Sequence, residues 1–271
     1  MSEHLLGVHD LSETAYHKAS GVSKSSLDRI APPYTPAHYR AYMDEPSEEP
    51  TEAQKFGSLL HAALLTPDKL DVAVKPEGLD MRTKTGKEWA ESNSGKNIIN
   101  SDQKTMIDRC IENVWKHPFA SRLMKSSDLE RSLFAEDSHG THRKGRLDIL
   151  PRGGNIVADL KTCQSAAPDE FEKSIYNYRY GVQSAYYLDL CELCGMEREK
   201  FVFICVEKSP PYLVAVYELD PDVVEFGRKL YQRDLTILRH CRETNTWPGY
   251  PVDVTRVGVP MFARKAMEAI L

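Results

Sequence analysis

The chain has 271 residues, of which 41% are hydrophobic and 28% are charged, a composition typical of soluble globular proteins. Its formal net charge is −5 and its pI is about 6.0, which argues against a broad basic surface that coats nucleic acid but allows a confined basic channel. No apolar run approaches the ~20 residues of a membrane span, and the N-terminus lacks the basic start and apolar stretch of a secretory signal.

Residues 1–20 are polar with little periodicity, so a flexible N-terminal arm is expected there. Helical stretches follow, because serine caps a helix start, proline suits the first turn and glycine ends a helix. The predicted helices span residues 23–30, 36–43, 52–65, 101–116, 168–194 (interrupted, or followed by a second helix), 221–244 and 262–271. The acidic stretch 44–51 is expected to be an exposed loop.

Strands are predicted in two groups. The first group is a meander of three strands at residues 129–135, 145–150 and 155–162, which are β-compatible and separated by turn residues. The second group is a pair at residues 201–207 and 212–219, joined across a Ser-Pro-Pro turn. The order of helices, three strands, helix, two strands and helix predicts one α/β domain over residues 21–271. Within it we expect a helical elaboration (21–128), a core (129–250) and a C-terminal tail (251–271).

Two neighbouring strands of the meander carry charged residues among apolar ones. Alternate residues of a strand share a face, so Asp159 and Lys161 point to one side and Leu160 to the other. A solvated ion pair on an edge strand would explain that triplet alone. However, Asp148 lies at the matching depth of the preceding strand, where a carboxylate is costly unless it is paired or bound to a metal. Such an oxygen cluster suits a hard divalent cation, Mg²⁺ or Mn²⁺.

Four short motifs, in order, resemble those of the RecB-like branch of the PD-(D/E)XK nuclease superfamily. Asp148, then ten intervening residues, then Asp159-Leu160-Lys161, is similar to the Asp…(Asp/Glu)-x-Lys signature. Gly57-Ser-Leu-Leu-His61 and Gln183-Ser-Ala-Tyr-Tyr187 resemble the Gly-x-x-x-His and Gln-x-x-x-Tyr motifs of this branch. Residues 22–30, 81–89 and 176–187 are similar to the RecE-like (exonuclease VIII) nucleases, and the likeness covers residues 20–250.

The resemblance implies a fold and a metal site. The fold is the αβββαβ core of the superfamily, a central mixed sheet flanked by helices, with the N-terminal helices as an elaboration. The implied cofactor is Mg²⁺, for which Mn²⁺ can substitute, bound by His61, Asp148, Asp159 and the backbone carbonyl of Leu160. By itself, His61 is also explained as a core histidine with a satisfied hydrogen bond. Glu130 either reaches the metal from the first strand or is an exposed carboxylate at the end of that strand.

The resemblance also assigns roles in catalysis and positioning. Lys161 would orient the attacking water and stabilise the transition state, rather than act as a base. Gln183 and Tyr187 lie one turn apart on a helix, face the same way, and would support the site and hold the end of the DNA strand. An aromatic stripe on a helix is, however, usually part of the core.

Contacts to DNA are predicted at a basic cluster and at one tyrosine. Arg82, Lys84 and Lys87 form the densest basic segment before the strands. A solvated loop would account for them, whereas the resemblance to RecE-like nucleases makes them contacts to DNA phosphates. Tyr180, one turn before Gln183, is included among these contacts. The hairpin residues His139, His142, Arg143 and Lys144 are expected to be exposed to solvent or to touch the DNA backbone.

By this resemblance, the enzyme would digest the 5′-ended strand of linear double-stranded DNA and leave a 3′ overhang. Its partners would be DNA ends and a RecT-like single-strand annealing protein. RecE-like nucleases form rings around the duplex, so a homo-oligomeric ring is expected, a tetramer rather than a trimer. A ring would reconcile the modest net charge with processivity, because enclosure replaces a strong electrostatic grip.

Other activities are compatible with parts of this pattern. They are an endonuclease or a CRISPR-associated (Cas4-like) nuclease of the same branch, a metal-dependent enzyme acting on a small phosphate ester, and a non-catalytic DNA-binding module that keeps the fold. The intact Asp148, Asp159 and Lys161 argue against the last of these.

The six cysteines follow no regular framework, which is typical of reduced thiols in the cytoplasm. Cys191 and Cys194 form a CxxC pair, and some RecB-like nucleases hold an iron-sulfur cluster. The other four cysteines do not resemble the pattern that closes such a cluster. The pair is therefore predicted to be structural, and the protein to be cytoplasmic.

Overall fold

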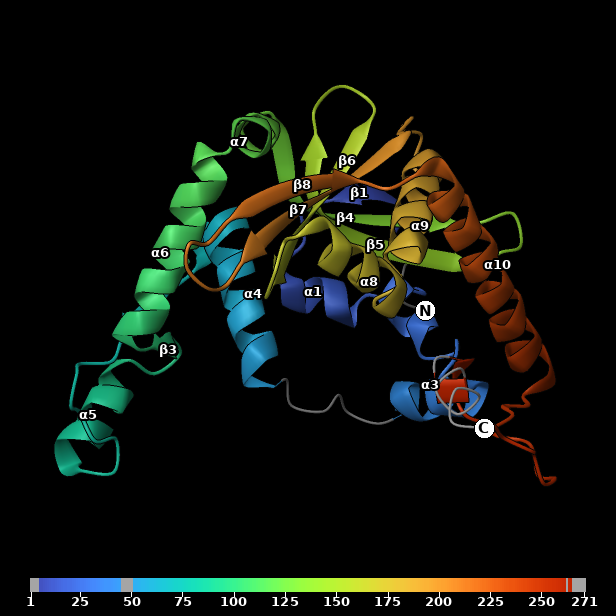
Figure 1. Cartoon of the computed structure of the whole chain (residues 1–271), viewed down its shortest axis with the longest axis horizontal. Helices are drawn as coiled ribbons and strands as arrows, with labels where there is room; N and C mark the ends of the chain where they lie inside the picture. The colour runs from blue at the N-terminus through green and yellow to red at the C-terminus, as the bar shows by residue number, and fades with distance from the viewer. Residues whose placement is uncertain (1–4, 45–50, 262, 265–271) are drawn as a thin grey trace.

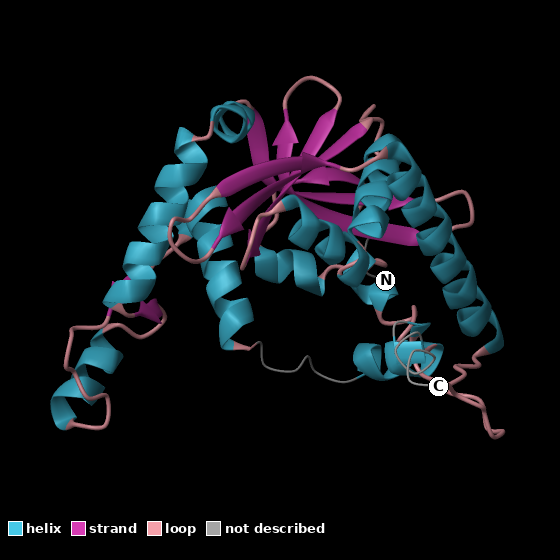
Figure 2. Cartoon of the chain, in the orientation of Figure 1, coloured by secondary structure: helices cyan, strands magenta, loops and turns pink. Residues whose placement is uncertain are grey.

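A six-stranded mixed sheet lies at the centre of the computed structural model, which describes residues 5–44, 51–261, 263 and 264 (Figure 1, Figure 2). The strand order is β1-β4-β5-β6-β7-β8; β6 and β7 are parallel, and the other four neighbouring pairs are antiparallel. The strands are β1 (Gly7–His9), β4 (Ser127–Glu136), β5 (His142–Pro151), β6 (Ile156–Cys163), β7 (Lys200–Glu207) and β8 (Val214–Glu218). The predicted α/β class and the mixed sheet flanked by helices are confirmed.

The helices give the molecule an arched outline (Figure 1). They are α1 (Glu13–Lys18), α2 (Lys24–Asp28), α3 (Pro36–Asp44), α4 (Glu52–Leu65), α5 (Lys84–Ser92), α6 (Ser101–Lys116), α7 (Pro118–Lys125), α8 (Pro168–Asn177), α9 (Tyr180–Leu193) and α10 (Pro221–Thr244). In Figure 1, α5 and α6 form one leg of the arch, α10 and α3 form the other, and α1 and α4 lie under the sheet between them. A small parallel pair, β2 (Val72–Val74) and β3 (Asn97–Ile99), belongs to the leg that carries α5.

Two apolar cores lie on the two faces of the sheet. β7 demonstrates this, because its alternate residues point to opposite faces. Phe201, Phe203 and Cys205 belong to the core that includes α9 and α10, whereas Val202, Ile204 and Val206 belong to the core that includes α4, α6 and α7. β7 and its parallel neighbour β6 are therefore buried between two helical layers, as parallel strands usually are.

Most predicted elements are present with ends that differ by a few residues. The structure divides the predicted stretch 168–194 into α8 and α9, which was one of the two forms expected. α5, α7 and the β2–β3 pair were not predicted from the sequence, although Pro118 at the first turn of α7 is a recognised start signal. The predicted loop residues 45–50 and most of the predicted helix 262–271 lie outside the described residues.

The expected flexible arm is wrong for residues 5–20. β1 pairs with β4 in the register Gly7↔Phe134, and Tyr16 of α1 is buried. The C-terminal end of α1 is held by Lys144, whose Nζ lies 3.1 Å from the Tyr16 carbonyl oxygen and 2.6 Å from that of Ala19. A polar segment without periodicity is thus ordered by long-range pairing, which sequence periodicity does not register.

The crossing of α9 and α10 depends on two glycines. A Cβ atom built on Gly227 would lie 2.2 Å from the backbone carbonyl carbon and oxygen of Gly181. A Cβ atom on Gly181 would in turn lie 2.7 Å from the carbonyl oxygen of Val223. The two helix backbones therefore touch where α9 and α10 cross, an approach that only glycine allows at these positions.

We predict that Gly227→Ala destabilises the fold by about 2–3 kcal/mol, because the added methyl group overlaps the backbone of α9. Urea unfolding followed by far-UV circular dichroism measures the change. Gly153→Ala is the matched control, since a Cβ atom there would meet nothing within 4 Å, and its stability should change by less than ~0.5 kcal/mol. Equal stability of the two variants would contradict the close helix crossing.

Candidate active site

Five elements bring the predicted site residues to one cleft of about 430 Å³. β4, β5 and β6 supply Glu130, Asp148 and Lys161, α4 supplies His61, and α9 supplies Tyr187. The start of α4 is fixed by Thr51, whose side chain accepts a hydrogen bond from the Gln54 backbone N–H. Gly57 faces β6, and a Cβ atom there would make an ordinary van der Waals contact, at 3.5 Å, with the Thr162 hydroxyl oxygen. His61, one turn later, therefore faces the strands.

His61 lies between two carboxylates. Its Nε2 is 2.7 Å from Asp148 Oδ2, and its Nδ1 is 3.1 Å from Glu130 Oε1. Burial by itself lowers the pKa of His61, but Asp148 and Glu130 outweigh burial and raise this pKa to about 10. His61 also helps to hold the pKa of Asp148 below its usual value, against the opposing effect of burial. Without a metal, the imidazolium thus offsets part of the negative charge of the two carboxylates, and Arg146 also pairs with Glu130.

The same three side chains meet the requirements of a divalent metal site. Their ligand atoms all lie within 4.8 Å of one another. Among the described residues, these three form the group of His, Cys, Asp or Glu side chains that is close enough to share one metal ion. One imidazole nitrogen and two carboxylate oxygens are donors that divalent cations accept. A metal ion would replace the proton on the His61 nitrogen that binds it, so metal binding requires a neutral imidazole. The donor set therefore fits the predicted metal.

Glu130 is held firmly in this cluster. Its side chain is 13% exposed, so it is not an exposed carboxylate at a strand end. Arg146 of β5 pairs with its other carboxylate oxygen. Its backbone has φ 55°, a left-handed conformation that costs free energy in a residue other than glycine. Glu130 belongs to the candidate site by geometry, and its role as a ligand stays a prediction.

Asp148 is oriented by the backbone of the next strand. β5 and β6 share a single bridge in the ladder, Ile149↔Ala158, and the Leu160 N–H donates to Asp148 Oδ2 at 2.8 Å. The carboxylate thus takes the hydrogen bond that a neighbouring strand carbonyl would otherwise accept. Leu160 lines the cleft, and the predicted binding of a metal by its carbonyl stays a prediction.

Asp159 and Lys161 form a second pair beside the first cluster. Lys161 Nζ lies 2.7 Å from Asp159 Oδ2, and the Gln183 side-chain amide donates to Asp159 Oδ1. Burial, followed by the negative charge of Asp148, raises the pKa of Asp159 to about 6. Asp159 lies outside this group of three side chains. A bound cation would, however, reduce the electrostatic repulsion between the carboxylates of Asp159 and Asp148. Its predicted role as a ligand is therefore untested.

Lys161 is a permanent positive charge at this site. Burial lowers its pKa, but Asp159 and Asp148 outweigh burial and raise the pKa above its usual value. A protonated ammonium cannot accept a proton, so Lys161 can orient water or stabilise a developing negative charge but cannot act as a base. The predicted role of Lys161 in orienting the attacking water stays a prediction.

Tyr187 and Gln183 both face the strands from α9, as predicted. Gly145 of β5 leaves the room that the Tyr187 ring needs, because a Cβ atom there would lie 2.8 Å from Tyr187 Cε1. Tyr187 lines the cleft, and burial keeps its pKa well above the usual value. The hydroxyl group is therefore neutral at physiological pH. No contact to DNA is tested for either residue.

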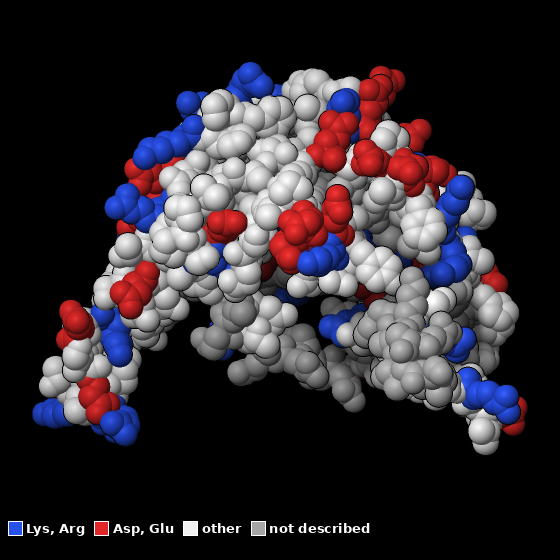
Figure 3. Space-filling model, in the orientation of Figure 1, with Lys and Arg blue, Asp and Glu red and all other residues white. Residues whose placement is uncertain are grey.

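Three of the four predicted DNA contacts, Arg82, Lys84 and Lys87, lie apart from the cleft. Arg82 and Lys84 are on the leg that carries α5, where their side chains are 91% and 90% exposed, and Figure 3 shows basic groups at the tip of this leg. Lys87 lies on the same helix and is also exposed. Tyr180 instead packs on the core residue Phe203, with ring centroids 4.9 Å apart. Binding of DNA by these four residues stays a prediction.

Two cations expected in an exposed hairpin are buried. Arg143 lies 4.4 Å from the ring centroid of Tyr186 and 5.0 Å from that of Tyr231, and Lys144 holds the end of α1. Both belong to β5, which begins at His142, so they are strand residues. The predicted strand began too late, at residue 145, because the charged residues before it were expected to be exposed to solvent.

The cleft has a wall that the sequence analysis missed. Glu13, Tyr16 and His17 of α1 and Ser25 of α2 line it, as does Arg146. Arg146 could have been found, because it lies two residues before Asp148 in one strand and shares its face. The α1 residues carried no signal, since their position depends on the pairing of β1 with β4.

Cys191 and Cys194 are both free thiols on or at the end of α9. Cys191 is fully buried, and Cys194 packs partly against the same core. This agrees with the structural role predicted for the pair.

Within the described ranges, none of the helices combines the length and the apolar character that a membrane span requires.

The fold and the site define a class of protein. A mixed sheet that presents an aspartate on one strand and Asp-x-Lys on the next, with a helical histidine opposite, is the arrangement of the PD-(D/E)XK nuclease superfamily. The chain belongs to the family described as PDDEXK-like domain of unknown function (DUF3799), whose model matches residues 23–256. The likeness to this superfamily is therefore confirmed, whereas the RecE-like subdivision stays a prediction.

Solved structures agree with this fold. A crystal structure of a protein from Eubacterium rectale, described as a candidate exonuclease, is similar with TM-score 0.65 and 14% identity, over 95% of this chain and 99% of that chain. A second structure, SSO0001, has 19% identity over 69% of this chain and 87% of that chain, but its TM-score of 0.30 is too low to support an argument. Among curated proteins, none matches this chain.

We predict that His61→Ala weakens Mn²⁺ binding at least about tenfold, because one of the three ligand side chains is lost. Isothermal titration of the purified protein with MnCl₂ measures the affinity. His139→Ala is the matched control, since His139 is exposed in the hairpin between β4 and β5, and its affinity should equal that of the unchanged protein. Equal affinities for both variants would remove His61 from the metal site.

Proposed function

We propose that the chain is a Mg²⁺-dependent 5′–3′ exonuclease that resects the 5′ strand of linear double-stranded DNA. The observation that carries this proposal is the meeting of His61, Glu130 and Asp148 next to the Asp159–Lys161 pair in one open cleft. Membership of the PDDEXK-like family supports nuclease chemistry.

Each residue of the site has its own role in the proposed hydrolysis of a phosphodiester. A divalent cation bound here would supply a water with a lowered pKa and polarise a phosphoryl oxygen. Asp148, Glu130 and neutral His61 would hold it, and Asp159 is proposed as a further ligand on the family resemblance. Lys161 places a fixed positive charge where negative charge develops on the phosphoryl group. The neutral hydroxyl of Tyr187 would donate a hydrogen bond to a phosphate oxygen.

Two observations support an exonuclease in particular. The Eubacterium rectale protein of the same fold is described as a candidate exonuclease. The motif residues of this chain also resemble RecE-like nucleases, which is the basis for 5′–3′ polarity, a 3′ overhang and a RecT-like annealing partner. The homo-oligomeric ring, with a tetramer preferred to a trimer, is proposed on the same resemblance.

We expect the protein to release nucleotides from blunt linear duplex DNA when Mg²⁺ is added, and to leave closed circular DNA intact. Labelling either the 5′ or the 3′ end of one strand, followed by denaturing electrophoresis, measures both activity and polarity. Mn²⁺ should support the reaction, and a chelator should abolish it. Cleavage of closed circles would favour an endonuclease, and loss of the 3′ label first would reverse the polarity.

Lys161→Met should lower the rate of DNA hydrolysis about 10²–10³-fold, because a fixed positive charge beside the reacting phosphate is lost. Single-turnover kinetics with saturating protein measure the chemical step, and circular dichroism checks that the variant folds. Lys229→Met, an exposed lysine of α10, is the matched control and should keep the rate of the unchanged protein. Full activity of Lys161→Met would exclude the proposed role of this ammonium group.

A further inference from the structure

Three stacked aromatic rings lead from the core to the surface beside the candidate site. Phe203 of β7 is fully buried, the Tyr180 ring stacks on it, and the Tyr178 ring stacks on Tyr180 with centroids 5.7 Å apart and planes 28° apart. Tyr178 is 62% exposed, so the outermost ring of the stack is open to solvent. We call Phe203, Tyr180 and Tyr178 the aromatic ladder.

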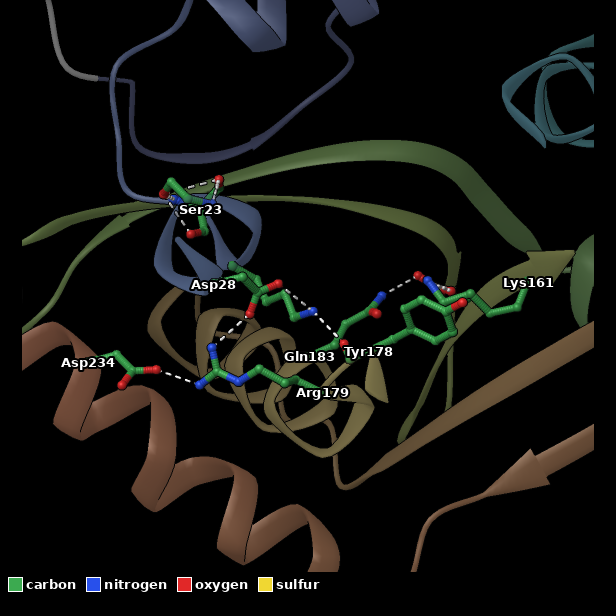
Figure 4. A network of polar contacts seen from close by, with 10 residues as sticks. Ser23, Asp28, Lys161, Tyr178, Arg179, Gln183 and Asp234 are labelled. Carbon is green, nitrogen blue, oxygen red and sulfur yellow. Dashed lines mark hydrogen bonds and ion pairs between the residues drawn. The ribbon is translucent and has the colours of Figure 1, made fainter. Parts of the chain in front are cut away.

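The turn that carries the ladder is anchored by buried charges (Figure 4). Arg179, between the two tyrosines, has φ 54°, a left-handed conformation that is unfavourable in a residue other than glycine. Its guanidinium pairs with Asp28 of α2 at 2.9 Å and with Asp234 of α10, which is fully buried. Two helices, α2 and α10, thus hold this left-handed residue in place between the two tyrosines.

A second contact ties the same turn to α2. Lys24 Nζ donates to the Tyr178 carbonyl oxygen at 2.9 Å and lies 2.8 Å from Asp28. α2 begins with a capping box formed by Ser23 and Ser26 (Figure 4). An exposed tyrosine on a free loop would lose its conformational freedom on binding, whereas the ring of Tyr178 is already positioned.

The ladder is continuous with the candidate site. Lys161 Nζ lies 5.1 Å from the centroid of the Tyr180 ring, so the middle ring contacts the ammonium group next to Asp159. Burial is the main cause that lowers the pKa of Lys24, and the positive charge of nearby Lys161 lowers this pKa further. A nucleotide whose phosphate lies at Lys161 would therefore have the ladder within reach of its base.

We propose that the aromatic ladder is a stacking platform for an unpaired base of the DNA strand that enters the cleft. An exposed tyrosine ring at the end of an aromatic stack offers a flat apolar face that any base can cover. The substrate class is thus a strand whose terminal bases have left the duplex, rather than a fully paired end. This inference rests on the proposed nuclease function and adds the state of the substrate at the site.

The chemistry of the ladder favours a base over an apolar protein segment. Its middle ring, Tyr180, lies beside the Lys161 ammonium group, and the backbone carbonyl of its outer residue, Tyr178, accepts a hydrogen bond from Lys24. Phosphates follow every base of a nucleic acid strand. Tyr176, at the end of α8, adds a second exposed aromatic ring, at 86% exposure, two residues before Tyr178. Stacking faces combined with nearby cations are what sequence-independent binding of single strands uses.

The test uses a DNA hairpin with an unpaired 5′ tail that carries 2-aminopurine, a base whose fluorescence is quenched by stacking. Ca²⁺ replaces Mg²⁺ so that the DNA can bind without being cleaved. The unchanged protein should quench the tail fluorescence, and Tyr178→Phe should do the same because it keeps the ring. Tyr178→Ala should lose the quenching and bind the tailed hairpin about tenfold more weakly.

Two controls define the outcome. Binding of the same hairpin without a tail should change less than about twofold in Tyr178→Ala, because no unpaired base is present. Tyr250→Ala, at a tyrosine that is 69% exposed outside the ladder, should bind the tail like the unchanged protein. Unaltered quenching in Tyr178→Ala, or an equal loss in Tyr250→Ala, would overturn the stacking proposal.

Failure of the stacking proposal can be told apart from failure of the proposed function. A protein that hydrolyses linear duplex DNA with Mg²⁺ but never quenches the tail would overturn the platform alone. A protein that quenches the tail but hydrolyses no DNA would keep the platform and overturn the nuclease. Circular dichroism of Tyr178→Ala confirms that the variant folds, which is expected for a residue whose side chain is mostly in solvent.

Discussion

The candidate site depends on the balance of charge around two buried carboxylates. Asp148 and Asp159 lie on adjacent strands at the same depth, and their repulsion must be offset within the protein. His61 offsets the first and Lys161 the second, at 2.7 Å in each case. A buried charge without a partner costs several kcal/mol, so these two cations are as necessary to the folded state as to any chemistry.

The fold supplies this balance by opening one sheet ladder and placing a helix opposite the opening. β5 and β6 share one bridge before they separate, and Asp148 fills the gap by accepting from the Leu160 N–H. α4 then brings His61 between Asp148 and Glu130. Either a protonated His61 or a bound divalent cation can therefore offset the negative charge of these two carboxylates. This exchange explains how one arrangement can be stable without a metal and still be ready to bind one.

The surroundings of the cleft are held together by contacts between distant segments. Gln183 fixes Asp159, Arg179 fixes the turn before α9 through Asp28 and Asp234, and the Gly181–Gly227 crossing fixes α9 itself. A strand entering this cleft would meet a preformed wall, which reduces the entropy that binding costs. Proposed catalysis at Lys161 and proposed stacking on the aromatic ladder therefore depend on one scaffold.

The sequence by itself determined the central strands, the main helices, and the grouping of His61, Asp148, Asp159, Lys161, Gln183 and Tyr187. Period-two and helical patterns, with capping and proline signals, are local properties, and a known motif order adds the rest. Only the tertiary structure decided that α1 walls the cleft, that Arg143 and Lys144 are buried, and that the tight cluster contains Glu130 instead of Asp159. Those outcomes depend on pairings between distant segments, such as β1 with β4, and no local pattern encodes which distant residue a charge will meet.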